Sequence, residues 1–517
     1  MKLFKKINAK RALSALSALL IFVGCSTQLD EPQLNNNFAG GTDFTDASGM
    51  QLSVVGAYAA FQNRGWEQPL LISVRGDDVN AGGLGDQQDF AETDLFNYNK
   101  DYWMYNSLWE NVYRDVILAH TAMEQIVRYQ EFGDAADIAK GDQYIAEIKV
   151  LRAMMLFQIS EVWGDVFIPM SSNTNELLDV QTLPTKDEVM QHLSNQMDEA
   201  IPLLPNMRPN ERTDLPGGVT RYTALAIKAM ANQELKNYQA VADATGQIIS
   251  SGKFSLFPDF YELFKTPGKL SDESILDFQY SDYGQGEGDS SNHLYAPYGP
   301  QGWTPAVAGA GSGWGFYEPS MKFIKFMLDR GETVRLETSV LFTDRGIAEL
   351  QTDTNYATLP SFVSNTTRDG DVINDYARAL FASGKHYFPS NQLIPGRTAY
   401  GSNKNYNVIR YGEILLMYAE ALAHGASGSA MTADQAVNLV RTRAGMPALS
   451  GVTLDQIIDE KFAELGMEWG KRYYDLLRLE RYDELNYDGR TFSPSKSYLP
   501  YPQSQVDQFP ILGEQTN

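Results

Sequence analysis

The sequence predicts an all-α fold in which paired helices stack side by side, with little β structure and with long irregular loop excursions. Three observations support this prediction. Apolar stripes with helical spacing run up to residue 164, alanine-rich helical hairpins occupy residues 221–254 and 406–447, and residues 266–405 are rich in glycine and proline. A chain of 517 residues is long enough to bury a large core.

The amino terminus has the residue order of a secretory signal. Residues 1–11 are basic, residues 12–24 form an apolar segment, and Cys25, the single cysteine of the chain, follows directly. A helix of 13 apolar residues spans about 20 Å, which is short of the roughly 30 Å hydrocarbon core of a membrane. We therefore predict a signal peptide at residues 1–24, followed by a polar, flexible tether at residues 25–44.

Two long helices are expected to open the body of the chain. In residues 107–126, apolar side chains recur every three or four residues and form a stripe down one helix face. Residues 143–164 continue this pattern, and Gly164 stands where such a helix would end. We expect the stripe residues of both segments to be buried: Leu108, Val112, Val116, Ala119, Met123, Ile145, Ile148, Leu151, Met155 and Ile159.

Two later segments are typical of helical hairpins that pack through small residues. Alanines crowd the first helix of residues 221–254, and residues 236–240 form the expected turn. The second hairpin, residues 406–447, carries an apolar stripe that begins at Tyr411. Alanine at such contacts lets helix axes approach closely, so these segments resemble a tetratricopeptide-like stack, although without a clean repeat of about 34 residues.

Residues 266–405 have a different character, because glycine and proline interrupt every helical pattern. This predicts long excursions that are attached to the helical frame. Excursions of that length in a compact protein are usually functional.

The charge and motif content argues against several functions. The formal net charge is −23 and we find no basic patch, so nucleic-acid binding is not expected. A single cysteine excludes intrachain disulfides, and the five histidines lack the spacing of a zinc site, so neither a metal nor a cofactor is predicted. Nucleophile-elbow and nucleotide-binding motifs are also missing. A glycoside hydrolase stays a remote alternative, because its two carboxylates need no sequence motif.

Eight blocks follow one another in a fixed order across residues 45–510 and at the amino terminus. They are "FVGC", "LWENVYRDVILAHTAMEQI", "AEIKVLRAMMLFQISEVWGDVFIP", "TRYTALAIKAMANQELKNYQAVADATGQIISSGKFSLF", "VIRYGEILLMYAEALAHG", "AVNLVRTRAGMP", "EKFAELGMEWGKRYYDLLRLER" and "YLPYPQSQVDQFP". Together these blocks resemble the SusD/RagB family of nutrient-binding outer-membrane lipoproteins.

The resemblance implies a tetratricopeptide-like superhelix of four helix pairs, in which residues 45–265 and 266–517 pack as one globular unit. It also implies a binding protein rather than an enzyme. Such a protein captures an oligosaccharide outside the cell and delivers it to a SusC-like, TonB-dependent β-barrel transporter, on which it acts as a lid. A peptide is the alternative ligand, and a member that serves mainly as a lid is a further alternative.

The segment around Cys25 predicts where in the cell the protein is located. "FVGC" resembles a bacterial lipobox, which implies that Cys25 is lipidated and anchors the protein in the membrane. The acidic "QLDE" that follows resembles the tag that sends lipoproteins of Gram-negative, Bacteroidetes-type bacteria to the outer face of the outer membrane. A plain signal peptide that ends near a cysteine is the alternative.

Many charged residues fall within the family-like blocks of the carboxy-terminal half. A catalytic role and a structural role are both conceivable for them. Because they lie on expected helices, we predict that they form interhelical ion pairs and hydrogen bonds. These residues are Glu413, Glu420, Arg441, Arg443, Glu464, Glu468, Arg472 and Asp475.

Two aromatic-rich regions, residues 64–105 and 280–317, predict a binding surface in loops. Sugar rings present flat C–H faces that stack on aromatic planes, while amide and guanidinium groups bind their hydroxyls. Trp109, Trp163 and Trp469 lie on helical segments and are expected in the core. We expect Trp66, Trp103 and Trp303 to form a stacking platform beside Tyr98 and Tyr298, with hydrogen bonds from Arg75 and Asn80, whereas Trp314 fits a structural or a binding role equally.

Overall fold

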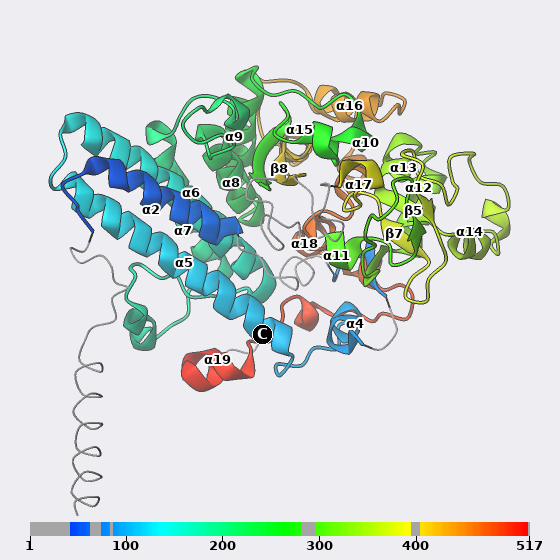
Figure 1. The fold of residues 1–517 in the computed structure, drawn as a ribbon, viewed down its shortest axis with the longest axis horizontal. Coiled ribbons are helices and arrows are strands. Elements are labelled where there is room, and N and C mark those ends of the chain that lie inside the picture. Colours follow the sequence, from blue (N-terminus) through cyan, green and yellow to red (C-terminus); the bar gives the residue numbers. More distant parts are fainter. Residues whose placement is uncertain (1–41, 63–73, 83–85, 281–294, 394–403, 515–517) are drawn as a thin grey trace, which may run out of the picture.

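The computed structural model describes residues 42–62, 74–82, 86–280, 295–393 and 404–514 (Figure 1). Cys25, Trp66, the expected signal peptide and most of the expected tether therefore lie outside the described residues.

A stack of helices forms the larger part of the molecule (Figure 1). From α5 to α9 each helix packs against the next, and α9 then packs against α15, although residues 251–410 separate them in sequence. The all-α prediction is confirmed, because helices dominate and sheet is scarce. The helices of this part are α2 (Met50–Gln62), α5 (Trp103–Gln130), α6 (Ala135–Trp163), α7 (Lys186–Ala200), α8 (Arg221–Glu234), α9 (Tyr238–Ser250), α15 (Tyr411–Ala423), α16 (Ala433–Arg443), α17 (Leu454–Leu465) and α18 (Lys471–Arg478).

The helix ends are specified locally by side chains that satisfy free backbone groups. Asp134 forms a capping box at the start of α6, and Gly164 ends that helix with a φ of 75°. Threonines do the same at the starts of four further helices. They are Thr185 before α7, Thr220 before α8, Thr432 before α16 and Thr453 before α17.

The predicted stripes face the core. Most stripe residues of α5 and α6 are buried, while Met123 and Ile145 are half-buried and pack against the same core. The four alanines of α8 are fully buried, which lets this helix pack closely against α7 and α9. One cluster of buried apolar side chains extends from Met50 to Leu512 and so includes residues from both halves of the chain.

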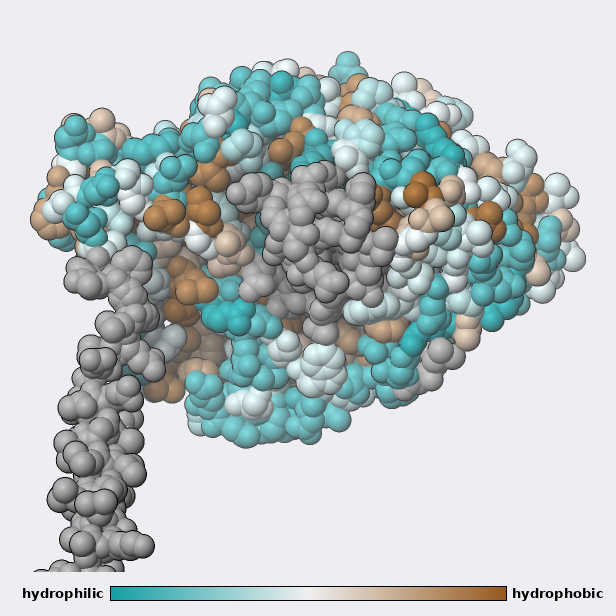
Figure 2. All heavy atoms as spheres, viewed as in Figure 1, coloured by the Kyte–Doolittle hydropathy of each residue, from teal (hydrophilic) through white to brown (hydrophobic). Residues whose placement is uncertain are grey.

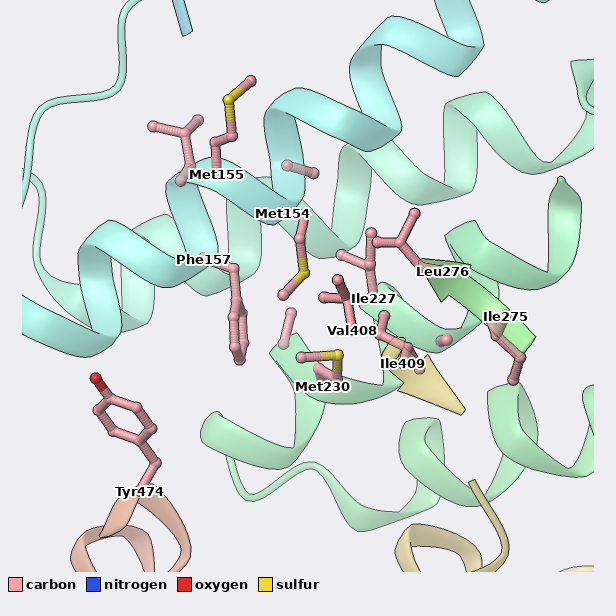
Figure 3. Close-up of a cluster of buried hydrophobic side chains, with 14 of the residues drawn as sticks. Met154, Met155, Phe157, Ile227, Met230, Ile275, Leu276, Val408, Ile409 and Tyr474 are labelled. Atoms are coloured by element: carbon pink, nitrogen blue, oxygen red, sulfur yellow. The ribbon is translucent and has the colours of Figure 1, made fainter. Parts of the chain in front are cut away.

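The first five residues of the second predicted hairpin are a strand rather than a helix. Residues Tyr406–Arg410 form β8, which pairs antiparallel with β2 (Ser274–Phe278). The β-branched Val408 and Ile409 are buried, and Figure 3 shows them beside Ile227 and Met230 of α8. The helical prediction was wrong here because pairing with β2, which lies far away in sequence, satisfies the backbone of these residues.

Residues 251–405 form a smaller part with short elements, as the loss of helical periodicity predicted (Figure 1). Four two-stranded sheets occur among the described residues, and one of them pairs Asn80 with Glu318. The sheets are β1 (Val79–Ala81) with β4 (Tyr317–Pro319), β2 with β8, β3 (Trp303–Thr304) with β6 (Val372–Ile373), and β5 (Val340–Phe342) with β7 (Phe381–Ser383). The short helices of residues 251–405 are α10 (Phe260–Leu263), α11 (Tyr295–Tyr298), α12 (Met321–Asp329), α13 (Val334–Ser339) and α14 (Asp344–Leu350). Two further short helices, α4 (Gln88–Asp94) and α19 (Gln503–Gln508), lie elsewhere in the chain.

A buried network of ion pairs joins this smaller part to the helical stack. Arg410 pairs with Glu273, Glu464 and Glu468, and Arg335 of α13 reaches Glu464 from the other side. The predicted ion pairs are present and many of them join two helices, but Glu468 lies beyond the end of α17 and pairs with Arg410 of β8 and with Lys385. Further pairs join Glu413 to Lys471, Glu420 to Lys461 and Arg478, Arg441 to Glu460, Arg443 to Glu273 and Glu464, Arg472 to Asp77, and Asp475 to Lys461.

The surface is largely hydrophilic on the face shown in Figure 2, where apolar residues form separate patches. Within the described ranges, every helix is too short or too polar to cross a membrane.

Candidate functional site

Trp103 is the most exposed of the predicted platform residues that the structure describes. It is the first residue of α5, and 54% of its surface is exposed. Trp103 was expected in a loop, but helix α5 begins at this residue, four residues before the helical segment that the apolar stripe predicts. Its indole packs edge-to-face against Phe90 of α4, with ring centroids 6.4 Å apart. The helix therefore fixes the backbone of Trp103 and presents its side chain to solvent.

Five further rings form a connected series of contacts that begins at Trp103. Phe90 contacts Tyr317 of β4 at 5.8 Å between centroids, and Tyr317 contacts Phe316 at 6.3 Å. Phe316 in turn packs against Trp314 at 5.2 Å. With Tyr298, which lies 5.3 Å from Tyr317, these residues form one continuous group. We call it the aromatic cluster, and it comprises Phe90, Trp103, Tyr298, Trp314, Phe316 and Tyr317.

Tyr298 supports this cluster from inside the protein. It is 1% exposed, and its ring stacks on His386 with centroids 4.1 Å apart and planes 13° from parallel. The Nδ1 atom of His386 lies 2.7 Å from Ser383 Oγ. Burial, together with Lys404 and Lys385, holds the pKa of His386 well below its usual value, so this ring is neutral. Tyr298 was expected beside the platform, but it lies beneath it.

Trp303 belongs to a neighbouring apolar group. It lies on β3, is half-buried, and packs against Leu341, Ile373, Ala382 and Tyr387. Its ring meets Tyr387 edge-to-face at 6.1 Å. Trp303 and Trp314 thus come from adjacent segments of one excursion, but the described ring contacts place them in different clusters.

Gly315 sets the turn that carries Trp314 and Phe316. Its φ is +63°, a conformation that side-chain-bearing residues rarely adopt. A Cβ atom at this position would lie 2.6 Å from Cε2 of Tyr376. Both the backbone angle and the lack of space therefore require glycine between two rings of the cluster.

Three of the predicted ligand-binding side chains bond to other parts of the protein instead. They are Arg75, Asn80 and Tyr98. Arg75 is fully buried, its guanidinium lies 4.5 Å from the ring centroid of Tyr473, and its Nη2 donates to Tyr474 Oη at 3.1 Å. Because a ligand at the surface cannot reach an enclosed side chain, the expected ligand contact of Arg75 is replaced by a structural one. Asn80 Oδ1 accepts from Arg490 and Tyr487, and Tyr98 donates its hydroxyl to the carbonyl of Lys496.

Four residues of this region were not expected from the sequence. Two of them, Phe316 and Tyr317, directly follow residues 311–315, "GSGWG", and the glycines around Trp314 were a usable signal. No sequence signal pointed to Phe90 or to Arg378. The guanidinium of Arg378 lies 4.6 Å from the ring centroid of Phe316, and the same group forms an ion pair with Asp86.

A buried carboxyl group fixes the strand that carries Tyr317. Glu318 accepts hydrogen bonds from the backbone amides of Leu380 at 2.7 Å and Phe381 at 3.0 Å. Burial raises the pKa of Glu318 to about 7 in spite of these donors. This contact joins β4 to the start of β7 and so positions the aromatic cluster on the smaller part of the molecule.

The arrangement suits binding by stacking. An exposed indole above a supported set of rings offers an apolar plane to the C–H face of a sugar, and nearby polar groups can contact hydroxyls. Among the residues that the structure describes, no group of three or more His, Cys, Asp and Glu side chains is arranged to hold a metal ion.

Comparison with known proteins gives consistent matches along the chain. A family model described as "SusD family" matches residues 272–513, and one described as "Starch-binding associating with outer membrane" matches residues 53–231. A SusD-like protein of Bacteroides ovatus is 22% identical over 99% of this chain and 98% of its own. A SusD-like protein of Formosa agariphila is 25% identical over 92% of each chain.

A solved structure extends the match to three dimensions. Surface glycan-binding protein A of Bacteroides thetaiotaomicron, in complex with laminarihexaose, superimposes with a TM-score of 0.72 at 26% identity. The match covers 89% of this chain and 97% of the other.

Proposed function

Because this chain belongs to the SusD/RagB family, we propose that it captures oligosaccharides at the cell surface and delivers them to a SusC-like, TonB-dependent transporter. The family predicted from the eight sequence blocks is thereby confirmed. The similar solved structure is named a surface glycan-binding protein, and one matching family model is described as starch-binding and associated with the outer membrane.

The exposed side chain of Trp103 is the observation that carries the binding proposal. An indole with 54% of its surface exposed, at a position fixed by a helix start and by Phe90, gains little from folding itself. Stacking of such a ring on a sugar is worth about 1 to 3 kcal/mol, in the range of a binding hot spot. Trp314 and Arg378 lie on the same cluster and extend the surface available to a chain of several sugars.

The similar surface glycan-binding protein was solved with laminarihexaose, so this oligosaccharide is the first ligand to test. In this proposal Cys25 is lipidated, and the tether holds the binding domain at the outer face of the outer membrane beside its transporter. Cys25→Ala should release the protein from the membrane fraction. The ligand should be recovered with unchanged chain length, because binding involves no hydrolysis.

The test uses the soluble chain of residues 26–517 and isothermal titration against laminarihexaose and against a panel of starch oligosaccharides and peptides. We expect binding to a glycan, and Trp103→Ala should weaken it by about 1 to 3 kcal/mol. Phe132→Ala is the matched control, since Phe132 is also exposed, at 60%, but lies beyond the other end of α5. A helix of 28 residues separates the two positions by about 42 Å.

Two results would contradict the proposal. Equal affinity of the Trp103→Ala and Phe132→Ala proteins would remove the aromatic cluster from the binding site. Binding of peptides in place of glycans would show that the alternative ligand class is the correct one.

A further inference from the structure

Several carboxylates lie on segments that contact Trp103 or adjoin it in the chain. Helix α4, which packs against Trp103 through Phe90, carries Asp89 and Glu92. The pKa of the Tyr102 hydroxyl, next to Trp103 in the chain, is raised by burial and by the charges of Glu92 and Asp89. The negative field of α4 therefore reaches the residue that precedes the exposed indole.

Two more carboxylates lie in the same region. Asp101 is exposed two residues before Trp103, and Asp86 is exposed at the start of the segment that leads into α4. Asp101 is therefore a free negative charge close to Trp103 in the chain, whereas the charge of Asp86 is balanced by its ion pair with Arg378.

Among the described residues, most of the nearby cations already have a partner within the protein. Arg378 lies over Phe316, but its guanidinium is paired with Asp86. Lys496 donates to the carbonyl of Phe96 at 2.7 Å, and Arg490 pairs with Asp94. Lys100 is exposed in the turn before α5, beside Asp101.

An anionic sugar needs a cation with spare hydrogen-bonding capacity to replace the water that it loses. Asp86 and Arg378 neutralise each other, so the described residues of this region present Asp89, Glu92 and Asp101 against Lys100. The net charge of −23 on the whole chain adds a repulsive long-range field, which salt screens beyond about 8 to 10 Å.

We propose that the surface around Trp103 selects uncharged glycans and rejects glycans that carry carboxylate or sulfate groups. This inference rests on the proposed function, because it concerns the ligand class of the same site. A neutral sugar stacks on the ring and uses the carboxylates as hydrogen-bond acceptors for its hydroxyls, whereas an acidic sugar meets like charge at the same positions.

The experiment compares matched polymers that differ only in charge. Laminarin and soluble starch are tested beside their carboxymethylated derivatives, and alginate and polygalacturonate are added as natural polyanions, by affinity electrophoresis and titration at low and high salt. We expect each carboxymethylated polymer to bind at least tenfold more weakly than its neutral parent. The ratio should fall as the salt concentration rises, because screening weakens the repulsion.

A double variant, Asp89→Asn with Glu92→Gln, tests whether α4 is the source of the selectivity. It should reduce the neutral-to-anionic affinity ratio severalfold. The control, Glu131→Gln with Glu349→Gln, removes the same charge at exposed positions on other elements and should leave the ratio near the parent value.

The outcomes separate this inference from the function on which it rests. Tight binding of a carboxymethylated polymer, or of alginate or polygalacturonate in preference to every neutral glycan, would overturn the inference and leave glycan capture standing. Failure to bind any of the polymers would overturn both. An equal ratio in the two double variants would remove Asp89 and Glu92 as the cause and overturn the role proposed for α4.

Discussion

Glu464→Gln should strongly destabilise the protein, because this carboxylate lies at the centre of the buried ion-pair network. Glu464 is fully buried on α17 and accepts hydrogen bonds from Arg410, Arg443 and Arg335, the last at 3.4 Å. Arg335 belongs to the smaller part of the molecule, and Arg410 and Arg443 flank helices of the stack. The substitution keeps the shape of the side chain and removes the charge that these three guanidinium groups share.

The pKa of Glu464 gives the magnitude of the expected loss of folding free energy. Burial alone would raise it, but Arg443, Arg410 and Arg335 together lower it from 4.5 to about 2. At about 1.4 kcal/mol for each pH unit, this difference corresponds to about 3 kcal/mol of folding free energy at neutral pH. Because the pKa is depressed in the folded state, the contribution is complete above 4.5 and is lost as the pH falls towards 2. Loss of one partner from a buried ion pair typically costs about 3 to 5 kcal/mol, which agrees with this estimate.

The assay is urea denaturation of the soluble chain, followed by tryptophan fluorescence and by circular dichroism, at pH 7 and at pH 3. We expect Glu464→Gln to lose about 3 kcal/mol at pH 7 and clearly less at pH 3. Glu349→Gln, at an exposed position on α14, is the control and should change little. A penalty equal to that of the control, or one that does not depend on pH, would refute the argument that the three arginines stabilise the ionised form.

Two other predictions follow from single contacts. His192 of α7 accepts from Arg152 Nη2 at 3.3 Å, and burial together with that guanidinium lowers its pKa from 6.5 to about 4. The wild type should therefore lose stability as the pH falls from 6.5 towards 4, and His192→Gln should lose less over that range. If the urea midpoint falls by the same amount from pH 7 to pH 5 in both proteins, the prediction is wrong. Gly315→Ala should weaken glycan binding severalfold, because a Cβ atom would lie 2.6 Å from Tyr376 and displace the turn that bears Trp314. If the glycan affinity of this variant, measured by titration, equals that of the wild type, the turn is not part of the binding surface.

The helical stack could be predicted because its information is local. The stripe of α5, the glycine after α6 and the alanines of α8 each specify an element within one or two helical turns, and the structure places them as expected. Strand β8 could not be predicted in the same way, since its partner β2 lies about 130 residues earlier and only their pairing makes residues Tyr406–Arg410 extended.

The sequence predicted the region of the candidate site and several of its rings, but not which rings are exposed, and the reason is physical. Aromatic residues in glycine-rich segments indicate a surface, but an exposed ring and a bracing ring have the same sequence signature. Trp103 and Tyr298 illustrate this, since the first is 54% exposed and the second 1%. Their roles are decided by partners far away in the chain, Phe90 for one and His386 for the other.

The buried charges explain how an irregular excursion can hold the aromatic cluster in place. Residues 251–405 have few long elements of their own, and apolar packing alone is tolerant of small shifts. The guanidinium of Arg335 and the ammonium of Lys385 instead meet fixed acceptors on and beside α17, where each hydrogen bond has a defined direction. Lys385 directly precedes His386, which stacks on Tyr298 below the aromatic cluster. A shift of the segment beside α17 would therefore reach Tyr298 through Lys385 and His386. In the proposed function, these charged residues would support binding by positioning the aromatic cluster.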